Sequence, residues 1–380
     1  MSSAVTSERQ AILETVRQFC EAEIRPHVLD WDERQHFPRE VFRKLGELGF
    51  LGTIFPEEYG GAGLSARDYA AIVEEVAAVD GSVALSLAAH TSLGSNHIFQ
   101  FGTEAQRRKY VPRLASGQWL AAWGLTEAEA GSDSGGTRTT AVRDGDGWVL
   151  NGSKNFITNA SVAGVAVLMA VTDRAAGRHG ISSFIVELDN PGIRVGKKEN
   201  KLGMRASDTC TLVMEDCRVP ASHLLGREGD GFVNSMKILD GGRIGIAALS
   251  VGIARGAYEA ALAYARQRRQ FGRPICEFEG IQFYLAEMAT DIDAARLLTE
   301  RAASAKDAGE TVTRLSAQAK MFASEMAVKV CDRAVQIHGG YGFIKDFPVE
   351  KYYRDVKLCT IGEGTTEIQK LVIAKSILAG

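Results

Sequence analysis

The chain has 380 residues, of which 45% are hydrophobic and 24% are charged, and its formal net charge is -3. This balance is typical of a folded globular protein and excludes a nucleic-acid binder that depends on a broad basic field. No run of about 18 or more apolar residues is present, and the first residues lack the basic and apolar regions of a secretory signal. We therefore expect a cytoplasmic protein without a membrane span.

Cysteine and histidine spacing predicts neither a disulfide framework nor a metal site. The six cysteines are scattered without a Cys-x-x-Cys pair, and the seven histidines include no His-Glu-x-x-His arrangement. We expect reduced thiols that mostly fill the core, and no bound metal.

Residues 1–120 are predicted to form a helical N-terminal domain. Apolar residues recur at helical spacing from Glu8 to Val28, and Pro26 marks the expected end of that helix. Further helices are expected from Pro38, over 68–79, over 82–100, and from Pro112 to about Gly117. His90 and His97 lie inside the apolar stretch 82–100, and we interpret both as structural residues of the core.

Residues 121–227 are predicted to form a β domain, a small barrel or sandwich. β-branched runs cover 148–150, 162–171, 182–187 and 209–214. The segments 143–148 and 150–153 contain Asp-Gly and Asn-Gly steps, which are typical of tight hairpin turns.

Residues 228–380 return to helical periodicity and are predicted to form a helical C-terminal domain. Long helices are expected over 232–270, 281–308 and 312–338. The order helical, β, helical is not a βαβ pattern, so a Rossmann fold is unexpected. Gly241-Gly242-Arg243 lies in the middle of a helix and not after a strand, so it is no dinucleotide fingerprint.

The segment Ile361-Gly362-Glu363-Gly364-Thr365 is the leading candidate for chemistry. It places one carboxylate between two glycines, directly before a predicted helix in which Thr366 and Gln369 have capping-box spacing. An acid on such an elbow is exposed to a neighbouring cleft. The alternative from these residues alone is an idle turn with a solvated glutamate.

Four other segments have both a functional and a plain interpretation. The glycine-rich stretch 124–136 offers backbone amides and hydroxyls to a phosphate or ring edge, or is a polar linker. Residues 155–159 could flank a planar ring, or form an ordinary strand. The arginines at 266–273 could bind a pyrophosphate or could form a solvated face. Residues 336–343 form a glycine-rich helix end, which suits a plain cap.

Taken together these motifs resemble the acyl-CoA dehydrogenase family. Gly-Leu-Thr-Glu-x-x-Ala-Gly-Ser-Asp at 124–133 is similar to its first signature, and Gln-x-x-Gly-Gly-x-Gly-Phe from Gln336 to its second. Glu363-Gly364-Thr365 followed by Glu367-Ile368-Gln369 resembles its catalytic segment. The resemblance runs from the first helix to the last and includes 56–61 and 201–205.

The resemblance implies a helical N-terminal domain, a β middle domain and a C-terminal four-helix bundle, assembled as a homotetramer with FAD at its interfaces. Residues implied to hold FAD are Trp123, Leu125, Thr126, Gly131, Ser132, Phe156, Ile157, Thr158, Thr365, Thr366 and Glu367. Residues implied to reach the adenosine side from a neighbouring subunit are Arg268, Phe271, Gln336, Ile337, Gly339 and Gly340. Implied substrate contacts are Ser132, Asp240, Arg243 and Gly364.

The implied reaction is α,β-dehydrogenation of an acyl-CoA thioester. Glu363 removes the α proton while the β carbon gives a hydride to the flavin, and the electrons pass to an electron-transferring flavoprotein. An ordinary glutamate has a pKa near 4.3 and is a weak base, so desolvation by the bound acyl chain and hydrogen bonds to the thioester carbonyl are required. Alternatives are an acyl-CoA oxidase and a non-catalytic flavin-binding scaffold of the same fold.

Departures from the family pattern bear on the substrate. Many relatives have Tyr at the position of Gly362, so its absence favours short branched or bulky acyl groups. Some relatives carry the base at the position of Gly242, which leaves Glu363 as the candidate here. An Arg near Ala84 is typical of glutaryl-CoA enzymes, and its absence disfavours a dicarboxylyl substrate.

Overall fold

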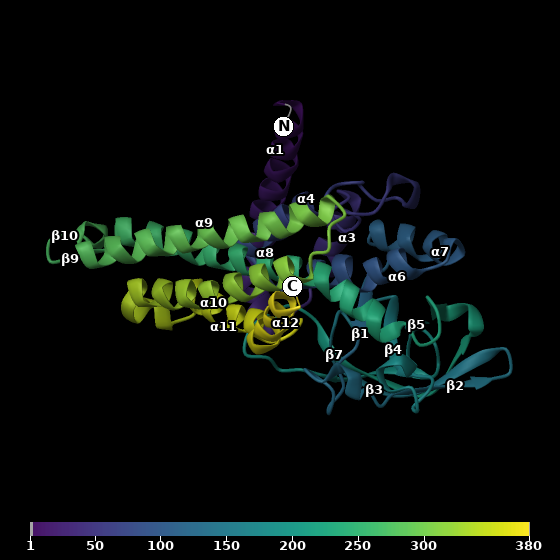
Figure 1. Ribbon diagram of the computed structural model, residues 1–380. Coiled ribbons are helices and arrows are strands. Elements are labelled where there is room, and N and C mark those ends of the chain that lie inside the picture. Colours follow the sequence, from purple (N-terminus) through teal and green to yellow (C-terminus); the bar gives the residue numbers. More distant parts are fainter. Residues whose placement is uncertain (1–2, 380) are drawn as a thin grey trace.

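The computed structural model describes residues 3–379, and its N-terminal third is helical (Figure 1). Its α-helices are α1 (Ser3–Phe19), α2 (Val28–Arg34), α3 (Arg39–Glu47), α4 (Ala66–Val79), α5 (Gly81–Ala88), α6 (Asn96–Phe101) and α7 (Glu104–Ala115). Two π-helical segments, η1 (Cys20–Ile24) and η4 (Ala89–Ser95), interrupt the helical path. The expected helix over 82–100 is therefore present, but η4 divides it.

One of the two predictions about proline in this region was wrong. Pro112 does not begin a helix, because it lies inside α7, which starts after the N-cap Thr103 with a Thr103–Gln106 capping box. Pro26, in contrast, marks the end of the first helix as expected, because the helical path of α1 and η1 stops at Ile24. A short 3₁₀ turn, η2 (Arg25–His27), accommodates the missing N–H of Pro26 in its first turn and leads directly into α2.

The middle of the chain forms one eight-stranded sheet. Its strands are β1 (Ala121–Gly124), β2 (Thr140–Asp144), β3 (Gly147–Thr158), β4 (Val165–Val171), β5 (Ile181–Glu187), β6 (Ile193–Lys198), β7 (Thr209–Pro220) and β8 (Leu224–Leu225). They run in the order β6-β7-β3-β2-β4-β5-β8, and β1 pairs with β4 in parallel. This parallel pair joins the end of the N-terminal helices to the centre of the sheet.

One of the two expected hairpin turns is present and the other is not. The Asp144–Gly147 pair closes the turn between β2 and β3. Asn151-Gly152, in contrast, lies within β3 at an irregularity in its pairing with β7. A Cβ at Gly152 would lie 2.6 Å from Thr139 Oγ1, so close backbone approach, and not a turn, explains this glycine.

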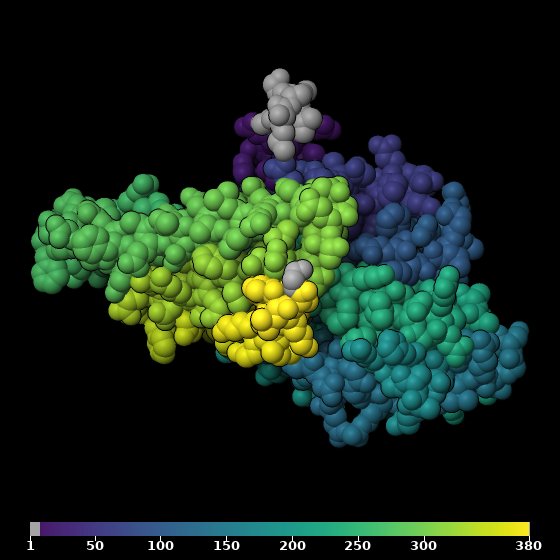
Figure 2. All heavy atoms as spheres, viewed as in Figure 1, coloured from purple at the N-terminus to yellow at the C-terminus, as the bar shows by residue number. Residues whose placement is uncertain are grey.

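The C-terminal part is a bundle of long helices. They are α8 (Gly231–Gln267), α9 (Glu279–Asp307), α10 (Thr313–His338), α11 (Val349–Val356) and α12 (Thr366–Leu378). The short hairpin of β9 (Arg269–Gln270) and β10 (Arg273–Pro274) lies at the end of the bundle that is far from the sheet (Figure 1). In Figure 2 the yellow surface of α12 lies at the junction between the bundle and the teal β region.

Helix α8 is the central element of the bundle and packs closely on α4. A Cβ at Gly252 would lie 2.4 Å from the Glu74 carbonyl oxygen, and one at Gly256 would lie 2.3 Å from that of Ala78. Glycine therefore permits the close approach of the two helices. Among the described helices, α8 alone is long and apolar enough to cross a membrane, but 67% of its most apolar window is buried inside the fold, as in a core helix.

The core consists of three apolar clusters, one of which connects the helices to the sheet. One large apolar cluster joins the N-terminal helices to the C-terminal bundle, and a second, smaller cluster is formed by the sheet around Trp148 and Phe184. A third cluster joins them through residues of η4, β1, β4 and α8, among them Leu93, Val167 and Leu239. The six cysteines are free thiols, and all except Cys276 are buried, as expected.

Candidate active site

The carboxyl group of Glu363 lies against Gly242 of α8, beside Leu93 of η4. It is carried by the loop between η10 (Lys357–Thr360) and α12, and Glu363 has a left-handed φ of 53°. Its Oε2 atom is buried against Gly242 on α8 and has no hydrogen-bond partner in residues 3–379. A buried carboxylate oxygen without a partner is rare in proteins, and this one is able to accept a hydrogen bond or a proton from a bound ligand.

The surroundings make Glu363 a much stronger base than an ordinary glutamate. Burial raises the pKa of its carboxyl to about 7, while the positive charges of Lys320 and Arg243 lower it. Because general bases work best when their pKa lies near the working pH, this value suits proton abstraction at neutral pH.

Helix α12 begins one residue earlier than predicted. Its N-cap is Thr365, whose hydroxyl accepts from the Ile368 N–H at 3.4 Å, so the expected capping box of Thr366 and Gln369 was wrong. Thr366 is buried and donates to Glu325, while Glu367 is exposed. The predicted cofactor residues Thr365, Thr366 and Glu367 therefore form the first turn of α12, next to Glu363.

Two residues that sequence reasoning missed hold this loop. The buried Gln369 side chain donates to the carbonyl oxygens of Glu363 at 3.2 Å and Gly364 at 2.9 Å. The buried Lys320 ammonium on α10 donates to the same Gly364 oxygen at 2.7 Å. The signal that could have revealed Lys320 is its helical spacing from Ser316 and Ala323, which places a lysine on the buried face of α10.

The two predicted substrate contacts on α8 lie beside the same carboxyl. Arg243 follows Gly242 directly, is 5% exposed, and donates to Asp240 at 2.6 Å. Asp240 also accepts from Thr313 at 2.5 Å. Burial lowers the pKa of Arg243 and raises that of Asp240, and the buried Nε of Arg243 has no partner within the described chain. The pair therefore keeps one donor free for a ligand.

The predicted flavin residues of the β domain gather at the edge of the sheet where strands β1 and β3 end. Trp123 lies on β1, with Leu125 and Thr126 just after it, and Phe156, Ile157 and Thr158 end β3. The Asn155 N–H donates to the Thr126 oxygen at 2.9 Å, which joins the two segments. The buried Lys154 donates to Leu125 and forms an ion pair with Glu127 at 2.6 Å. Sequence reasoning missed this Lys154–Glu127 pair.

The surface at this edge is open to a planar ligand. Phe156 is 63% exposed and has a left-handed φ of 59°. A Cβ at Gly131 would meet no described atom within 4 Å, and Ser132, the next residue of that loop, is exposed. Trp123 is fixed by an indole hydrogen bond to the buried His97 at 2.9 Å, so His97 has the structural role that was expected.

Segment η4 connects this edge to Glu363. A Cβ at Gly242 would lie 2.9 Å from the Leu93 side chain. The next residue, Gly94, packs on β1, where a Cβ at Gly94 would lie 2.7 Å from the Ala121 Cβ. Leu93 and Gly94 of η4 thus link the position on α8 that contacts Glu363 to the start of β1.

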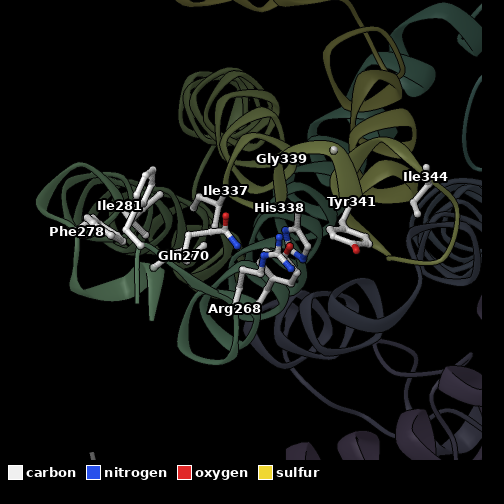
Figure 3. A pocket seen from close by; sticks show the side chains of 13 residues that line it. Arg268, Gln270, Phe278, Ile281, Ile337, His338, Gly339, Tyr341 and Ile344 are labelled. Atoms are coloured by element: carbon white, nitrogen blue, oxygen red, sulfur yellow. The ribbon is translucent and has the colours of Figure 1, made fainter. Parts of the chain in front are cut away.

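The third predicted group forms a separate cavity of about 610 Å³ (Figure 3). Its lining includes Arg268, Phe271, Ile337, Gly339 and Gly340, and Gln336 is adjacent in sequence but is not part of the lining. Phe271 is 93% exposed, and Gly339 has a φ of 61°. Arg268 ends α8, 26 positions after Gly242, and a rise of 1.5 Å per residue separates them by about 39 Å. One chain therefore does not bring this cavity to Glu363.

Family models match nearly the whole chain. The acyl-CoA dehydrogenase N-terminal, middle and C-terminal domain models match residues 6–118, 122–217 and 229–378.

The chain belongs to the acyl-CoA dehydrogenase family. This confirms the family that the motifs indicated and the three-domain fold class, and it makes the protein an oxidoreductase.

Relatives include enzymes named for opposite directions of the reaction. The chain is 49% identical to the probable acyl-CoA dehydrogenase YngJ of Bacillus subtilis, covering 100% of both chains. It is 44% identical to acryloyl-CoA reductase (NADH) of Anaerotignum propionicum, covering 100% of this chain and 96% of the relative.

Solved structures of family members have the same fold. Butyryl-CoA dehydrogenase from Megasphaera elsdenii is 44% identical with a TM-score of 0.96, covering 97% of this chain and 98% of its own. A chain in the structure described as the electron transferring flavoprotein of Acidaminococcus fermentans is 45% identical with a TM-score of 0.98, covering 100% of both.

Members of the acyl-CoA dehydrogenase family bind FAD. A glutaryl-CoA dehydrogenase from Mycobacterium smegmatis in complex with FADH2 is 32% identical with a TM-score of 0.93, covering 98% of this chain and 95% of its own. The residues present here fit that cofactor. The exposed Phe156 and the bare Gly131 suit a flat ring system, and the arginine and paired glycines of the far cavity suit a phosphate-bearing nucleotide.

Proposed function

We propose that this protein dehydrogenates a short or branched acyl-CoA thioester to the trans-2-enoyl-CoA, with Glu363 as the base. The observation that supports this most is the Glu363 carboxyl, whose pKa is raised to about 7 and whose Oε2 atom lacks a partner among the described residues. The family membership supplies the reaction class, and the site supplies the residue.

The mechanism assigns a distinct task to each part of the loop. Glu363 Oε2 takes the proton from the α carbon of the thioester, and a carbon–carbon double bond forms as the β carbon loses a hydride. The chemistry that FAD supplies when bound is acceptance of this hydride. The Glu363 N–H has no acceptor within the described chain, so it is free to donate to the thioester carbonyl and to stabilise enolate-like charge.

Other predicted cofactor and substrate residues surround this centre. Trp123, Leu125, Thr126, Phe156, Ile157 and Thr158 would flank the flavin ring at the sheet edge. Gly131 and Ser132 would approach its phosphates, Ser132 would also contact CoA, and Arg243, Asp240 and Gly364 would contact substrate. The unpartnered Nε of Arg243 supports the substrate assignment.

The acyl group that we propose follows from Gly362. A Cβ at this position would lie 3.6 Å from the Leu358 oxygen, which is ordinary contact, so a side chain could be accommodated but is absent. The space beside the α and β carbons is therefore available to a branch. Ala84 is buried in α5 without a charge, which disfavours a dicarboxylyl substrate.

The assembly that we propose is a homotetramer in the cytoplasm. Arg268, Phe271, Gln336, Ile337, Gly339 and Gly340 would hold the adenosine side of FAD that is bound by a neighbouring subunit. The distance of about 39 Å along α8 supports this, because one chain cannot use both halves for one cofactor. The similar chain in the structure described as the electron transferring flavoprotein of Acidaminococcus fermentans supports that partner as the electron acceptor.

The test is anaerobic reduction of the bound flavin across a panel of acyl-CoA thioesters. Glu363→Gln should bind FAD normally and lose roughly a hundredfold or more in reduction rate. Reduction at the wild-type rate in that variant would contradict the assignment of the base. Absence of reduction by every thioester in the wild-type protein favours the scaffold alternative, and rapid reoxidation by oxygen favours an oxidase. A preference for reducing enoyl-CoA with NADH favours the direction named for the acryloyl-CoA reductase relative.

A further inference from the structure

A buried cation beside the Glu363 loop has no task in the proposed mechanism. Lys320 lies on α10 with its side chain fully buried, and its ammonium donates to the Gly364 carbonyl at 2.7 Å. Within residues 3–379 it forms no ion pair with a carboxylate. Burial of an ammonium without a counter-ion is costly, and an apolar side chain of similar length would avoid that cost.

The geometry points to Lys320 as a positioning residue for the catalytic base: we propose that its charge and its hydrogen bond together hold the Glu363 loop in the reactive geometry and set the pH range in which Glu363 can accept a proton. The proposal rests on the assignment of Glu363 as the base. Lys320 itself touches neither substrate nor cofactor in this arrangement, so it acts only through the loop.

The loop is in a conformation that must be held from outside. Glu363 has a φ of 53° and Gly364 a φ of 93°, so two successive residues are left-handed. For a non-glycine residue such as Glu363 this conformation is unfavourable and persists only when its surroundings fix it. Side chains from two different helices supply the fixing donors, Gln369 from α12 on the Glu363 and Gly364 carbonyls and Lys320 from α10 on Gly364 alone.

Fixing these carbonyls also fixes the groups that do the chemistry. These hydrogen bonds restrain the backbone from which the N–H and the side chain of Glu363 project. The N–H has no acceptor in the described chain, and the Oε2 atom stays against Gly242. The two donors thus orient both the proton acceptor and the donor to the thioester carbonyl.

Lys320 differs from Gln369 because it adds a positive charge. The charges of Lys320 and Arg243 lower the Glu363 pKa against the larger effect of burial, and the balance lies near 7. Burial lowers the Lys320 pKa to about 8, with Cys359, Glu363 and Glu325 raising it and Arg243 lowering it. From α4, the buried Tyr69 faces the same carboxyl, and burial keeps its hydroxyl protonated.

Removal of the Lys320 donor and removal of the Gln369 donor should therefore have different effects. Lys320→Met removes a charge and a hydrogen bond while keeping the length of the side chain. Gln369→Leu removes hydrogen bonds from the same loop without changing its charge. Lys375→Met, on the exposed side of α12, removes a lysine far from these contacts and is the matched control.

The decisive measurement is the titration midpoint of the Glu363 carboxyl. It is monitored through the infrared band of the protonated carboxyl, which is assigned to Glu363 because the band is lost in Glu363→Gln. We expect Lys320→Met to raise the midpoint by about one pH unit and to slow flavin reduction at pH 7 by roughly tenfold. Gln369→Leu should slow reduction without moving the midpoint, and Lys375→Met should change neither. An unmoved midpoint in Lys320→Met would overturn the proposal.

The infrared titration can still be interpreted if a variant is unstable or if the reaction is different from the one proposed. Where Lys320→Met does not fold, Lys320→Gln keeps a neutral donor for Gly364, and its midpoint should rise in the same direction. The infrared titration needs no turnover, so it tests Lys320 even if Glu363→Gln reduces flavin normally. In that case the base assignment fails, whereas an unmoved midpoint with an inactive Glu363→Gln refutes only the role of Lys320.

Discussion

The Glu363 carboxyl and the backbone of Gly242 are in direct contact, although 121 positions separate them in the chain. A Cβ on residue 242 would lie 1.9 Å from Glu363 Oε2 and 2.9 Å from the Leu93 side chain. Position 242, at which the resemblance places the base of some family members, and Glu363 therefore meet at one point of the structure. A side chain at residue 242 would therefore displace the Glu363 carboxyl from its present position against α8.

Gly242→Ala tests this relationship. The added methyl group must displace the Glu363 carboxyl, and a small misplacement of a base costs a large part of its rate. We expect flavin reduction by the preferred acyl-CoA to slow by roughly ten- to a hundredfold, with unchanged FAD content. The measurement is stopped-flow reduction under anaerobic conditions. A variant with the wild-type rate would show that the carboxyl does not need this space.

The pH dependence of stability gives a test of Glu363 that is independent of activity. Its pKa is raised from 4.5 to about 7 in the folded protein, so the folded state favours the protonated carboxyl. The associated stability is complete below pH 4.5 and is lost as the pH rises through 7.

Glu363→Gln cannot ionise and should therefore become more stable than the wild type over this interval. The difference should grow with pH and level off above 7 at up to about 3 kcal/mol, from roughly 1.4 kcal/mol per pH unit. Thermal unfolding of both proteins at a series of pH values measures it. A difference that is constant with pH would mean that the Glu363 pKa is not raised. In the wild type, kcat/KM should rise with pH to a plateau above about 7.

Gly362→Tyr tests the proposed acyl specificity. The site has ordinary contact distances to Leu358 for a Cβ, so the loop can retain its conformation while the ring enters the space beside the α and β carbons. We expect kcat/KM for isobutyryl-CoA and 2-methylbutyryl-CoA to fall by roughly tenfold relative to butyryl-CoA, in line with the contribution of a few methyl groups to binding. A wild-type enzyme that already prefers butyryl-CoA over every branched or cyclic thioester argues against the proposal.

Complementation between subunits tests the shared cofactor site. Glu363→Gln lacks the base, and Arg268→Ala should bind FAD weakly because the far cavity loses its cation. If a neighbouring subunit supplies Arg268, mixed oligomers of the two variants contain sites in which both residues are intact. Co-expression should then restore a substantial part of the activity, measured as flavin reduction per subunit. No restoration is expected if each chain builds its whole site alone, and separately purified, unmixed variants are the control.

Several features of the fold could be predicted from sequence because their signals are local. Helical spacing located α8, α9 and α10 to within a few residues, since one apolar stripe must face the core of the bundle. The change to β-branched runs after Trp119 located the sheet. The proposed domain boundaries at 120/121 and 227/228 rest on the same change of pattern and remain a prediction.

Local signals failed where a second segment decides the conformation. Asn151-Gly152 has the composition of a turn, but contact with Thr139 makes it part of a strand. Pro112 has the composition of a helix start, but the Thr103 cap starts α7 at Glu104, eight positions before Pro112. Propensity is a weak preference of a few tenths of a kcal/mol to about 1 kcal/mol for most residues, and such contacts override it.

The sequence by itself determined the reaction class and the candidate base, because a glutamate between two glycines, followed by the family's helix start, is a contiguous motif. Only the tertiary structure decided what makes that glutamate reactive. Burial against Gly242, the donors from Lys320 and Gln369, and the charge of Arg243 come from three helices, and no spacing along the chain records their distances. The pKa of a carboxyl depends on these distances and on desolvation, which arise only when the chain folds.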